Sequence, residues 1–509
     1  MTLRVPLDCY PGINRFVLDW LRGDPTATRF LPRAAPTTTR PPGVASLHRK
    51  SIVPALAESN RRWGVFVDQQ LEQWASGQTV TIVGGQQVGF AGGPLYTLAK
   101  IATLVKMKRD MERDGMPVTA MFWLATEDHD YAEVAQLCVP VRTISREVNR
   151  QLDLVCVRGA RAFESKTAVG RLPVPDGLVT ELLALYGIER PEWLRPGITF
   201  GDSFAELVAG IFGSEVVLVD SLLPELRRAG APLFQSIFDR WSGIESAIAS
   251  RSADLMRSGY SPQVVPPRDG ESYSLLFELD DRFERQLIDG PRPVLPERIS
   301  TSALTRPLLQ DFVLRPDVFV GGPAEVSYYA QIMPLYELLD VPLPRVALRG
   351  HALVASKRML RFIERFSIRT EDIFTSPDQL LAGREPEGVD AIRREADRAR
   401  KELMRHIEHI GEIALPADHA LARAINRSIG HIEYHFNKLT ERAIRGLVRK
   451  DKERYAAAKE LVATLYPDRH MQDRIVGWFP YWHQHGSELV DRMIDEIEPD
   501  VATFNIIGL

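Results

Sequence analysis

The chain has 509 residues, of which 45% are hydrophobic and 26% are charged. This length supports about three domains, or two with a large insertion. The formal net charge of −4 excludes a disordered polyelectrolyte and a polybasic nucleic-acid-binding protein. The three cysteines (Cys9, Cys138 and Cys156) form no CxxC pair, which excludes a disulfide scaffold, a zinc ribbon and a thioredoxin-type site. We expect Cys138 and Cys156 to be core residues of a reduced protein rather than nucleophiles.

The N-terminal segment MTLRVPLDCYPGINRFVLDW is broken by charges and proline, so it does not resemble a signal peptide. No run of about 18 apolar residues offers a membrane span. These features predict a cytoplasmic enzyme with no membrane partner. Residues 24–46, rich in Pro, Thr and Ala, are typical of an extended segment.

The first clear boundary between predicted elements follows a helix predicted at residues 53–76. Residues 79–83 (TVTIV) are typical of a buried parallel strand, and the loop GGQQVGFAGGP follows them. A helix then begins near Pro94, whose missing N–H suits a first turn, and a second apolar run covers residues 118–125. Strand, loop, helix and strand form a βαβ unit.

The same pattern recurs downstream. Strands are predicted at residues 216–219, 318–320 and 344–348, and helices separate them. This alternation predicts a doubly wound, Rossmann-like α/β core. We assign residues 1–134, 199–261 and 301–384 to that core, residues 135–198 to a first connecting insertion, and residues 262–300 to a second, hairpin-like one.

The spacing of apolar residues changes after residue 385. Apolar residues recur every three or four positions in two stretches, with a turn around Pro416 between them. Residues 385–450 are therefore predicted to form an antiparallel helical coiled-coil arm, a packing or dimerisation element that makes a homodimer our expectation. Residues 451–509 are predicted to be helices that pack on the core, with Trp478 in an aromatic patch.

The glycine loop is the first candidate binding element. Its glycines let the backbone approach an anion at a helix N-terminus, while Gln86 and Gln87 offer donors and acceptors. It lacks the Walker A and GxGxxG patterns, and a tight turn that merely needs glycine is the alternative. The candidate ligand-binding residues here are Gly84, Gly85, Gln86, Gln87, Gly92 and Gly93.

The second candidate is Glu127-Asp128-His129-Asp130, directly after the strand at residues 118–125. Ligands bind at that edge of an open parallel sheet. Carboxylates around a histidine could make His129, with Asp128 and Asp130, an acid–base or amine-holding group, with Glu127 in the binding site. Metal binding is an alternative, and so is helix capping by Asp128 or Asp130.

Further candidates lie on the helix after the glycine loop and near a second glycine turn. Lys100 could reach a phosphate, and Arg306 suits a carboxylate or phosphate. The second turn supplies Gly321, Gly322 and Glu325. In a doubly wound sheet, loops from two such turns line the same crevice.

These motifs together resemble a known family, the bacillithiol biosynthesis cysteine-adding enzymes (BshC). The matching stretches are Gly84-Gly85-Gln86-Gln87 with Gly93-Pro94-Leu95-Tyr96, Phe122 to Asp130, Ser302-Ala303-Leu304 with Arg306 to Asp311, and Gly321 to Glu325. The likeness runs over essentially the whole chain and adds Tyr96 to the binding candidates.

The resemblance implies a core akin to class I nucleotidyltransferases and synthetases, connecting-peptide insertions and a dimerising coiled coil. It also implies a reaction, the joining of cysteine to glucosaminyl malate in the last step of bacillithiol synthesis. Forming that amide is uphill, so ATP or another nucleotide is expected. The HxGH and KMSKS signatures of synthetases are not intact, and Ser356-Lys357-Arg358-Met359 only faintly echoes the second.

Two alternatives stay open from the sequence. One is a metal-dependent nucleotidyl or phosphoryl transferase that uses the carboxylates of residues 127–130. The other is a non-enzymatic dimeric scaffold whose glycine loops are structural.

Overall fold

The computed structural model describes residues 2–33, 47–143, 151–159, 166–267, 272–382, 388–414, 419–450 and 452–509. Residue contacts divide the chain into two compact units. The core unit comprises Met1–Val141, Asp153–Lys357 and His470–Leu509, and the arm unit comprises Arg142–Leu152 and Arg358–Arg469.

A five-stranded parallel sheet lies at the centre of the core unit. Its strands, in spatial order, are β11 (Arg345–Leu348), β10 (Val318–Gly321), β2 (Val80–Gln86), β3 (Val118–Leu124) and β6 (Val217–Asp220). Along the chain this is the Rossmann order, because β2 begins the sheet and later strands are added first on one side and then on the other. The predicted doubly wound α/β core is confirmed.

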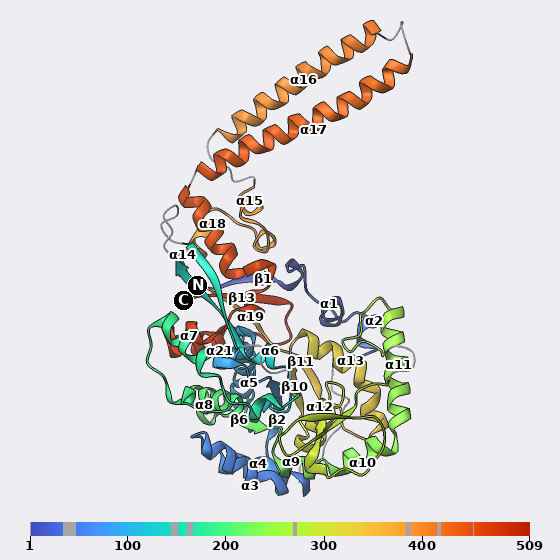
Figure 1. Cartoon of the computed structure of the whole chain (residues 1–509), viewed down its shortest axis with the longest axis vertical. Helices are drawn as coiled ribbons and strands as arrows, with labels where there is room; N and C mark the ends of the chain where they lie inside the picture. The colour runs from blue at the N-terminus through green and yellow to red at the C-terminus, as the bar shows by residue number, and fades with distance from the viewer. Residues whose placement is uncertain are drawn as a thin grey trace. The chain divides into compact units, whose positions relative to one another are not determined.

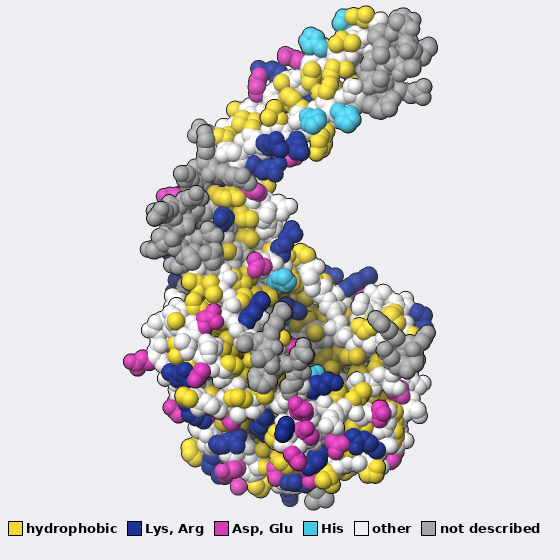
Figure 2. Space-filling model, viewed as in Figure 1, with side chains coloured by type: hydrophobic (Ala, Val, Ile, Leu, Met, Phe, Trp, Pro, Cys, Tyr) yellow, Lys and Arg dark blue, Asp and Glu magenta, His cyan; other side chains and the backbone are white. Residues whose placement is uncertain are grey.

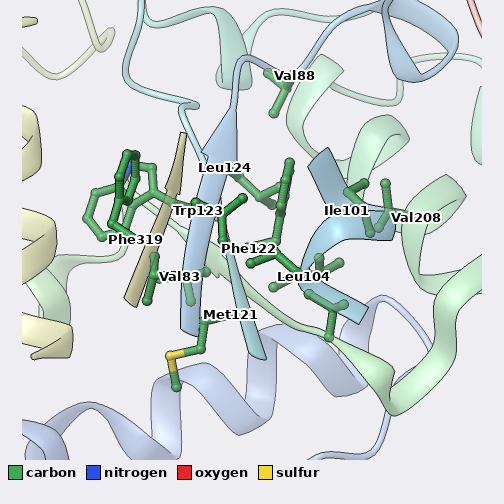
Figure 3. Close-up of a cluster of buried hydrophobic side chains, with 14 of the residues drawn as sticks. Val83, Val88, Ile101, Leu104, Met121, Phe122, Trp123, Leu124, Val208 and Phe319 are labelled. Carbon is green, nitrogen blue, oxygen red and sulfur yellow. The ribbon is translucent and has the colours of Figure 1, made fainter. Parts of the chain in front are cut away.

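Buried side chains on both faces explain why these strands are parallel and central. Every residue of β3 is buried, as expected when helices cover both faces of a sheet. Trp123 lies on the side of Phe319, whereas Phe122 lies on the side of Ile101 and Leu104 (Figure 3).

Helices from several parts of the chain cover this sheet, among them α5, whose Ile101 and Leu104 appear in Figure 3. The helices of this region are α3 (Leu47–Arg62), α4 (Asp68–Ala75), α5 (Leu95–Arg113), α6 (Tyr131–Val134), α8 (Phe200–Phe212), α9 (Pro224–Ala229), α10 (Ala231–Asp239), α11 (Trp241–Arg257), α12 (Arg306–Leu314) and α13 (Pro323–Leu338). The single helix expected over residues 53–76 is broken into α3 and α4, because Gly64 adopts a positive φ of 86° between them.

The first insertion contains β4 (Gln136–Thr143), β5 (Gln151–Arg158) and α7 (Asp176–Tyr186). Strands β4 and β5 pair with each other, and Cys138 is joined to Cys156 by a disulfide bond. The expectation that both cysteines are unbonded core residues is therefore wrong. Residues 18 positions apart in sequence meet because the two strands pair, which the spacing alone does not reveal.

The second insertion contains an antiparallel sheet in the order β8 (Arg285–Ile288), β7 (Leu276–Leu279) and β9 (Ile299–Thr301). Strands β7 and β8 form a hairpin and pair in register from Leu276 opposite Ile288.

A second, small sheet brings the two ends of the chain together. Strand β13 (Thr503–Gly508) lies between β1 (Thr2–Pro6) and β12 (His351–Ala355), so the termini lie side by side (Figure 1). The prediction that residues 451–509 are all helical is wrong at β13. The helices nearest to the chain ends are α1 (Arg15–Leu21), α2 (Pro25–Thr28), α19 (Gln472–Ile475), α20 (Phe479–His485) and α21 (Ser487–Glu496).

The segment expected to be extended from residue 24 begins with helix α2 instead. Asp24 accepts a hydrogen bond from the Thr26 backbone N–H, and Pro25 occupies the first turn, so the proline starts a helix here. Residues 34–46 of that segment lie outside the described residues.

The arm unit contains most of α14 (Lys357–Arg365), followed by α15 (Pro377–Leu380), α16 (Val389–Ala414), α17 (His419–Lys450) and α18 (Lys452–Leu465). Helices α16 and α17 lie side by side as a long pair (Figure 1), and hydrophobic side chains recur on their surface (Figure 2). The turn expected around Pro416 lies outside the described residues. The unit extends beyond the expected bounds of 385–450, because α18 packs against α15.

Among the helices of the described residues, none combines the length and apolarity needed to cross a membrane.

Candidate active site

A cavity of about 720 Å³ opens at the carboxyl ends of the central strands. Strand order reverses between β2 and β10, and in sheets of this type that point is where ligands bind. The wall is built from the glycine loop after β2, the segment after β3, the turn between β10 and α13, and the sheet of the second insertion.

Most of the residues singled out from the sequence converge on this cavity. Those that line it are Gly85, Gln86, Gln87, Tyr96, Lys100, Glu127, Asp128, His129, Arg306, Gly322 and Glu325. Those outside its lining are Gly84, Gly92, Gly93, Asp130 and Gly321.

The glycines outside the lining have packing explanations. Gly84 and Gly321 are strand residues of the central sheet. A Cβ on Gly92 would lie 2.4 Å from the ring of Trp478, and the Trp478 ring N–H donates to the Gly92 carbonyl at 2.9 Å. The N–H of Leu95 donates to the carbonyl of Val476 at 2.8 Å. The C-terminal segment therefore occupies the second half of the glycine loop, and only its first half faces the cavity.

Asp130 is the N-cap of α6. Its carboxylate accepts a hydrogen bond from the backbone N–H of Glu133 at 3.0 Å. Aspartate commonly caps the first turn of a helix in this way. Of the three acid–base candidates, His129 and Asp128 remain at the cavity.

Lys100 connects the two glycine turns. Its ammonium group, with a side chain only 1% exposed, donates to the Gly85 carbonyl at 2.6 Å, to Gln86 Oε1 at 2.9 Å and to the Glu325 carboxylate. Burial lowers the pKa of Lys100, and the charge of Glu325 opposes that effect. Glu325 also accepts a hydrogen bond from the Gly322 N–H at 2.8 Å. The Lys100–Glu325 ion pair therefore holds the floor of the cavity in place.

Arg306 lies at the edge of the same group. Its guanidinium donates to the Tyr328 hydroxyl and, at 3.3 Å, to Gln310 Oε1, and it lies 3.8 Å from Glu325. The side chain is 17% exposed.

Both carboxylate oxygens of Glu127 accept hydrogen bonds from protein donors. It accepts from Arg227 Nη2 at 3.1 Å, Ser300 Oγ at 2.8 Å, the Thr301 N–H at 3.0 Å and Thr301 Oγ1 at 2.8 Å. Glu127 therefore fastens β9 of the second insertion to the end of β3.

The surroundings of Asp128 favour its ionised form. Burial opposes ionisation, but hydrogen bonds from the Gln87 side chain and the His129 backbone N–H, together with the charge of Arg285, hold its pKa well below the ordinary value. Gln87 Nε2 donates to Oδ2 at 2.5 Å, and the His129 backbone N–H donates to Oδ1 at 2.7 Å.

Several lining residues were missed by sequence reasoning. Arg285, on β8, lies 2.9 Å from His129 through Nη1 and the Nδ1 ring nitrogen. Arg285 is the first residue of β8, whose burial runs buried, exposed, exposed, buried, so no alternating pattern marked it in the sequence. Glu133 also lines the cavity, and burial, followed by repulsion from Asp130 and Asp128, raises its pKa despite a hydrogen bond from Gln87.

Two further arginines come from distant segments. Arg349 donates to Asp473 at 2.9 Å and lies over the Tyr96 ring, 5.6 Å from its centroid. Arg474 lines the cavity as an exposed side chain, and within the described part of the chain no carboxylate pairs with it. No sequence signal marked either residue.

The described residues contain no group of three His, Cys, Asp or Glu side chains arranged to hold a metal ion. The alternative of a metal-dependent transferase thus finds no such cluster in the part of the chain that the structure covers.

The fold and the site define an enzyme with a Rossmann-like core, a cavity lined by charged side chains at the switch point, and a helical arm. Family models match almost the whole chain: the N-terminal Rossmann-like domain of bacillithiol biosynthesis BshC matches residues 14–292 and 278–350, and the C-terminal coiled-coil domain of BshC matches residues 352–509. The chain belongs to the BshC family.

Relatives named "Putative cysteine ligase BshC" are similar over nearly their full length. The protein of Solibacter usitatus is 30% identical over 90% of this chain and 89% of its own. That of Koribacter versatilis is 27% identical over 96% and 97%, and that of Geobacillus kaustophilus is 25% identical over 90% of each.

Proposed function

We propose that this chain is a cysteine ligase of bacillithiol biosynthesis that forms an amide between the carboxyl group of cysteine and the amine of glucosaminyl malate. The observation that carries the proposal is the cavity at the switch point, which the glycine loop, the segment after β3 and the turn after β10 line with charged and amide side chains. The near-full-length similarity to proteins named as cysteine ligases supports an enzyme rather than a scaffold.

The charges of the cavity suit substrates that carry both carboxylates and an amine. Lys100, Arg306, Arg349 and Arg474 are cations on its wall, and Arg474 is the one whose guanidinium no described carboxylate occupies. We assign the binding of a substrate carboxylate or phosphate to Arg474, because an arginine offers paired donors to such groups.

Two carboxylates of the lining suit the amine. Asp128 is held ionised there, and Glu133 has a raised pKa. An ionised carboxylate can hold an ammonium group, and a carboxylate with a raised pKa is a better proton acceptor. We assign amine holding to Asp128 and proton acceptance to Glu133.

A nucleotide such as ATP would supply the energy, because amide formation from a free carboxylate and an amine is uphill in water. The cavity has the location and size of a small-molecule site in this fold. The place of the cavity and the cations on its wall support a nucleotide substrate. We also propose a cytoplasmic location, where cysteine and nucleotides are available.

The test is an assay of the purified chain with cysteine, glucosaminyl malate and ATP, in which mass spectrometry identifies the thiol product and the nucleotide product. We expect the amide, with AMP or ADP formed in equal amount. Arg474→Gln should raise the KM of one substrate about tenfold, the value of one lost charge-assisted hydrogen bond. The matched control Arg228→Gln, at an exposed ion pair on α9, should leave KM unchanged. Absence of product with every nucleotide tried would contradict the proposal.

We further propose that the chain is a homodimer through the arm unit. Large apolar side chains are exposed on α16 and α17: Ile410, Ile413, Tyr434 and Leu439 are each at least 59% exposed. A second copy of the same helical pair would cover them as coiled-coil seams do.

A further inference from the structure

The contact between Arg285 and His129 determines where the imidazole carries its proton. Arg285 Nη1 lies 2.9 Å from His129 Nδ1. A guanidinium has donors only, so in this hydrogen bond Nδ1 must be the acceptor. A neutral imidazole carries one N–H, and here it is at Nε2.

The neighbouring carboxylate does not reverse this assignment. Asp128 Oδ1 is 3.5 Å from Nδ1, beyond a good hydrogen bond, and it already accepts the His129 backbone N–H at 2.7 Å. Gln87 occupies Oδ2 of Asp128. The charged groups that contact the His129 ring are Asp128 and Arg285, and Glu133 lines the same cavity.

Arg285 is itself held in place. Its side chain is 5% exposed, its Nη2 donates to the Thr301 carbonyl at 2.6 Å, and its guanidinium lies 4.0 Å from the centroid of the Phe277 ring. Thr301 is fastened to Glu127 through both its N–H and its hydroxyl. The chain of contacts from Glu127 through Thr301 and Arg285 therefore keeps the arginine from moving away from His129.

We propose that Arg285 is a positioning residue that keeps His129 neutral with its proton on Nε2, so that His129 donates a hydrogen bond to a ligand oxygen instead of accepting a proton. In the described part of the chain Nε2 has no protein partner, and His129 lines the cavity. The identity of the oxygen rests on the proposed function: it is the acyl oxygen of the cysteine carboxyl group after activation by the nucleotide. When the amine nitrogen bonds to the acyl carbon, the electron pair of the C=O bond moves onto this oxygen and Glu133 accepts the amine proton. The C=O bond then re-forms as the activating phosphate or AMP leaves. A fixed donor at that position stabilises the transition state.

The first test reads the tautomer directly and needs no activity. Protein labelled with ¹⁵N at histidine is compared with the His129→Gln variant, which identifies the signal of His129 by its loss. We expect the coupling pattern of an imidazole protonated only at Nε2 at pH 7.5. A pattern of Nδ1–H, or of a doubly protonated ring, would overturn the proposal.

The second test separates a donor from a base. The amide nitrogen of glutamine can stand in for Nε2–H, so His129→Gln should keep kcat within about tenfold of wild type, while His129→Ala should lose about 100-fold, the usual cost of one transition-state donor. If glutamine and alanine lose activity alike, His129 is not the donor.

Arg285→Met keeps an unbranched side chain over Phe277 but removes the donors. We expect its His129 signal to change to a mixture of protonation states, with Arg282→Met on the exposed turn of the same hairpin unchanged from wild type. An unchanged tautomer in folded Arg285→Met would refute the role of Arg285. Should Arg285→Met fail to fold, the wild-type spectrum still decides the tautomer. If wild type forms no amide, the proposed function fails, while the spectrum still decides the tautomer.

Discussion

Lys100 of α5 and Glu325 of α13 form an ion pair across the point where the strand order of the sheet reverses. The lysine side chain is 1% exposed and that of the glutamate 19%. Because the pair joins the first glycine loop to the second, the two halves of the Rossmann-like core meet at one buried charge contact beneath the cavity.

Breaking this pair from one side should be costly. Lys100→Met leaves the Glu325 carboxylate without its cation, and we expect the free energy of unfolding to fall by about 3 kcal/mol. Glu325→Gln in the same chain should recover more than half of that loss, because glutamine can still accept the Gly322 N–H and the carboxylate that lost its lysine partner is gone. Urea unfolding of the two single variants and the double variant measures the coupling. Additive losses would show that the two groups do not interact.

The docking of Trp478 on the glycine loop gives a second prediction. Gly92 has a φ of 86°, and an added Cβ would lie 2.4 Å from the Trp478 ring. Gly92→Ala should therefore lower the unfolding free energy by about 2–5 kcal/mol, the sum of left-handed backbone strain and overpacking.

Gly115→Ala is the matched control for this change. Gly115 has a similar φ of 83° but no atom within 4 Å of its added Cβ, so it should cost only about 1–2 kcal/mol. Thermal and urea unfolding report both variants. Equal losses would mean that the Trp478 contact adds nothing.

The sequence predicted the central sheet well, because its signals are local. Runs of β-branched and aromatic residues end at glycine or acidic turns, and parallel strands gather those turns at one edge. Gln87, Asp128 and His129 could be placed together for this reason, since each follows one of two adjacent strands.

The rest of the site depends on long-range docking that no local pattern encodes. Trp478 reaches Gly92 across 386 positions, and Arg285 reaches His129 across 156. The glycine loop looked like an anion site from its composition, yet its second half is filled by the C-terminal segment. The disulfide between Cys138 and Cys156 was missed because it depends on strand pairing, which cysteine spacing does not report.

His351 should make stability depend on pH. Its side chain is buried on β12, and neither ring nitrogen has a hydrogen-bond partner in the described structure. Burial, followed by the charge of Arg349, lowers its pKa from 6.5 to about 4, although Asp473, 4.0 Å from Nδ1, opposes the shift. The unfolded chain thus binds a proton more readily than the native one between these values. The neutral histidine contributes stability that is complete above pH 6.5 and is lost as the pH falls towards 4.

Replacing this histidine should remove that loss. The shift of about 2.5 pH units corresponds to about 3 kcal/mol, so His351→Phe should lose about that much less stability than wild type between pH 7 and pH 4. The exposed His406→Phe on the arm should behave as wild type. Urea unfolding at both pH values is the measurement, and parallel losses in all three proteins would contradict the assignment.

The exposed apolar side chains of the arm predict how the proposed homodimer responds to added charge. Leu439 on α17 is 65% exposed, and in a seam between two copies a glutamate there would be buried without a partner. Leu439→Glu should convert a dimer into a monomer, whereas Arg442→Glu, also exposed on α17, should leave the dimer intact. Light scattering after size exclusion gives the mass of each. Because every residue that lines the cavity belongs to the core unit, the monomeric variant should keep its ligase activity per chain. A monomeric wild type, or a dimer that survives both Leu439→Glu and Ile410→Glu, would show that these side chains are not the contact between copies.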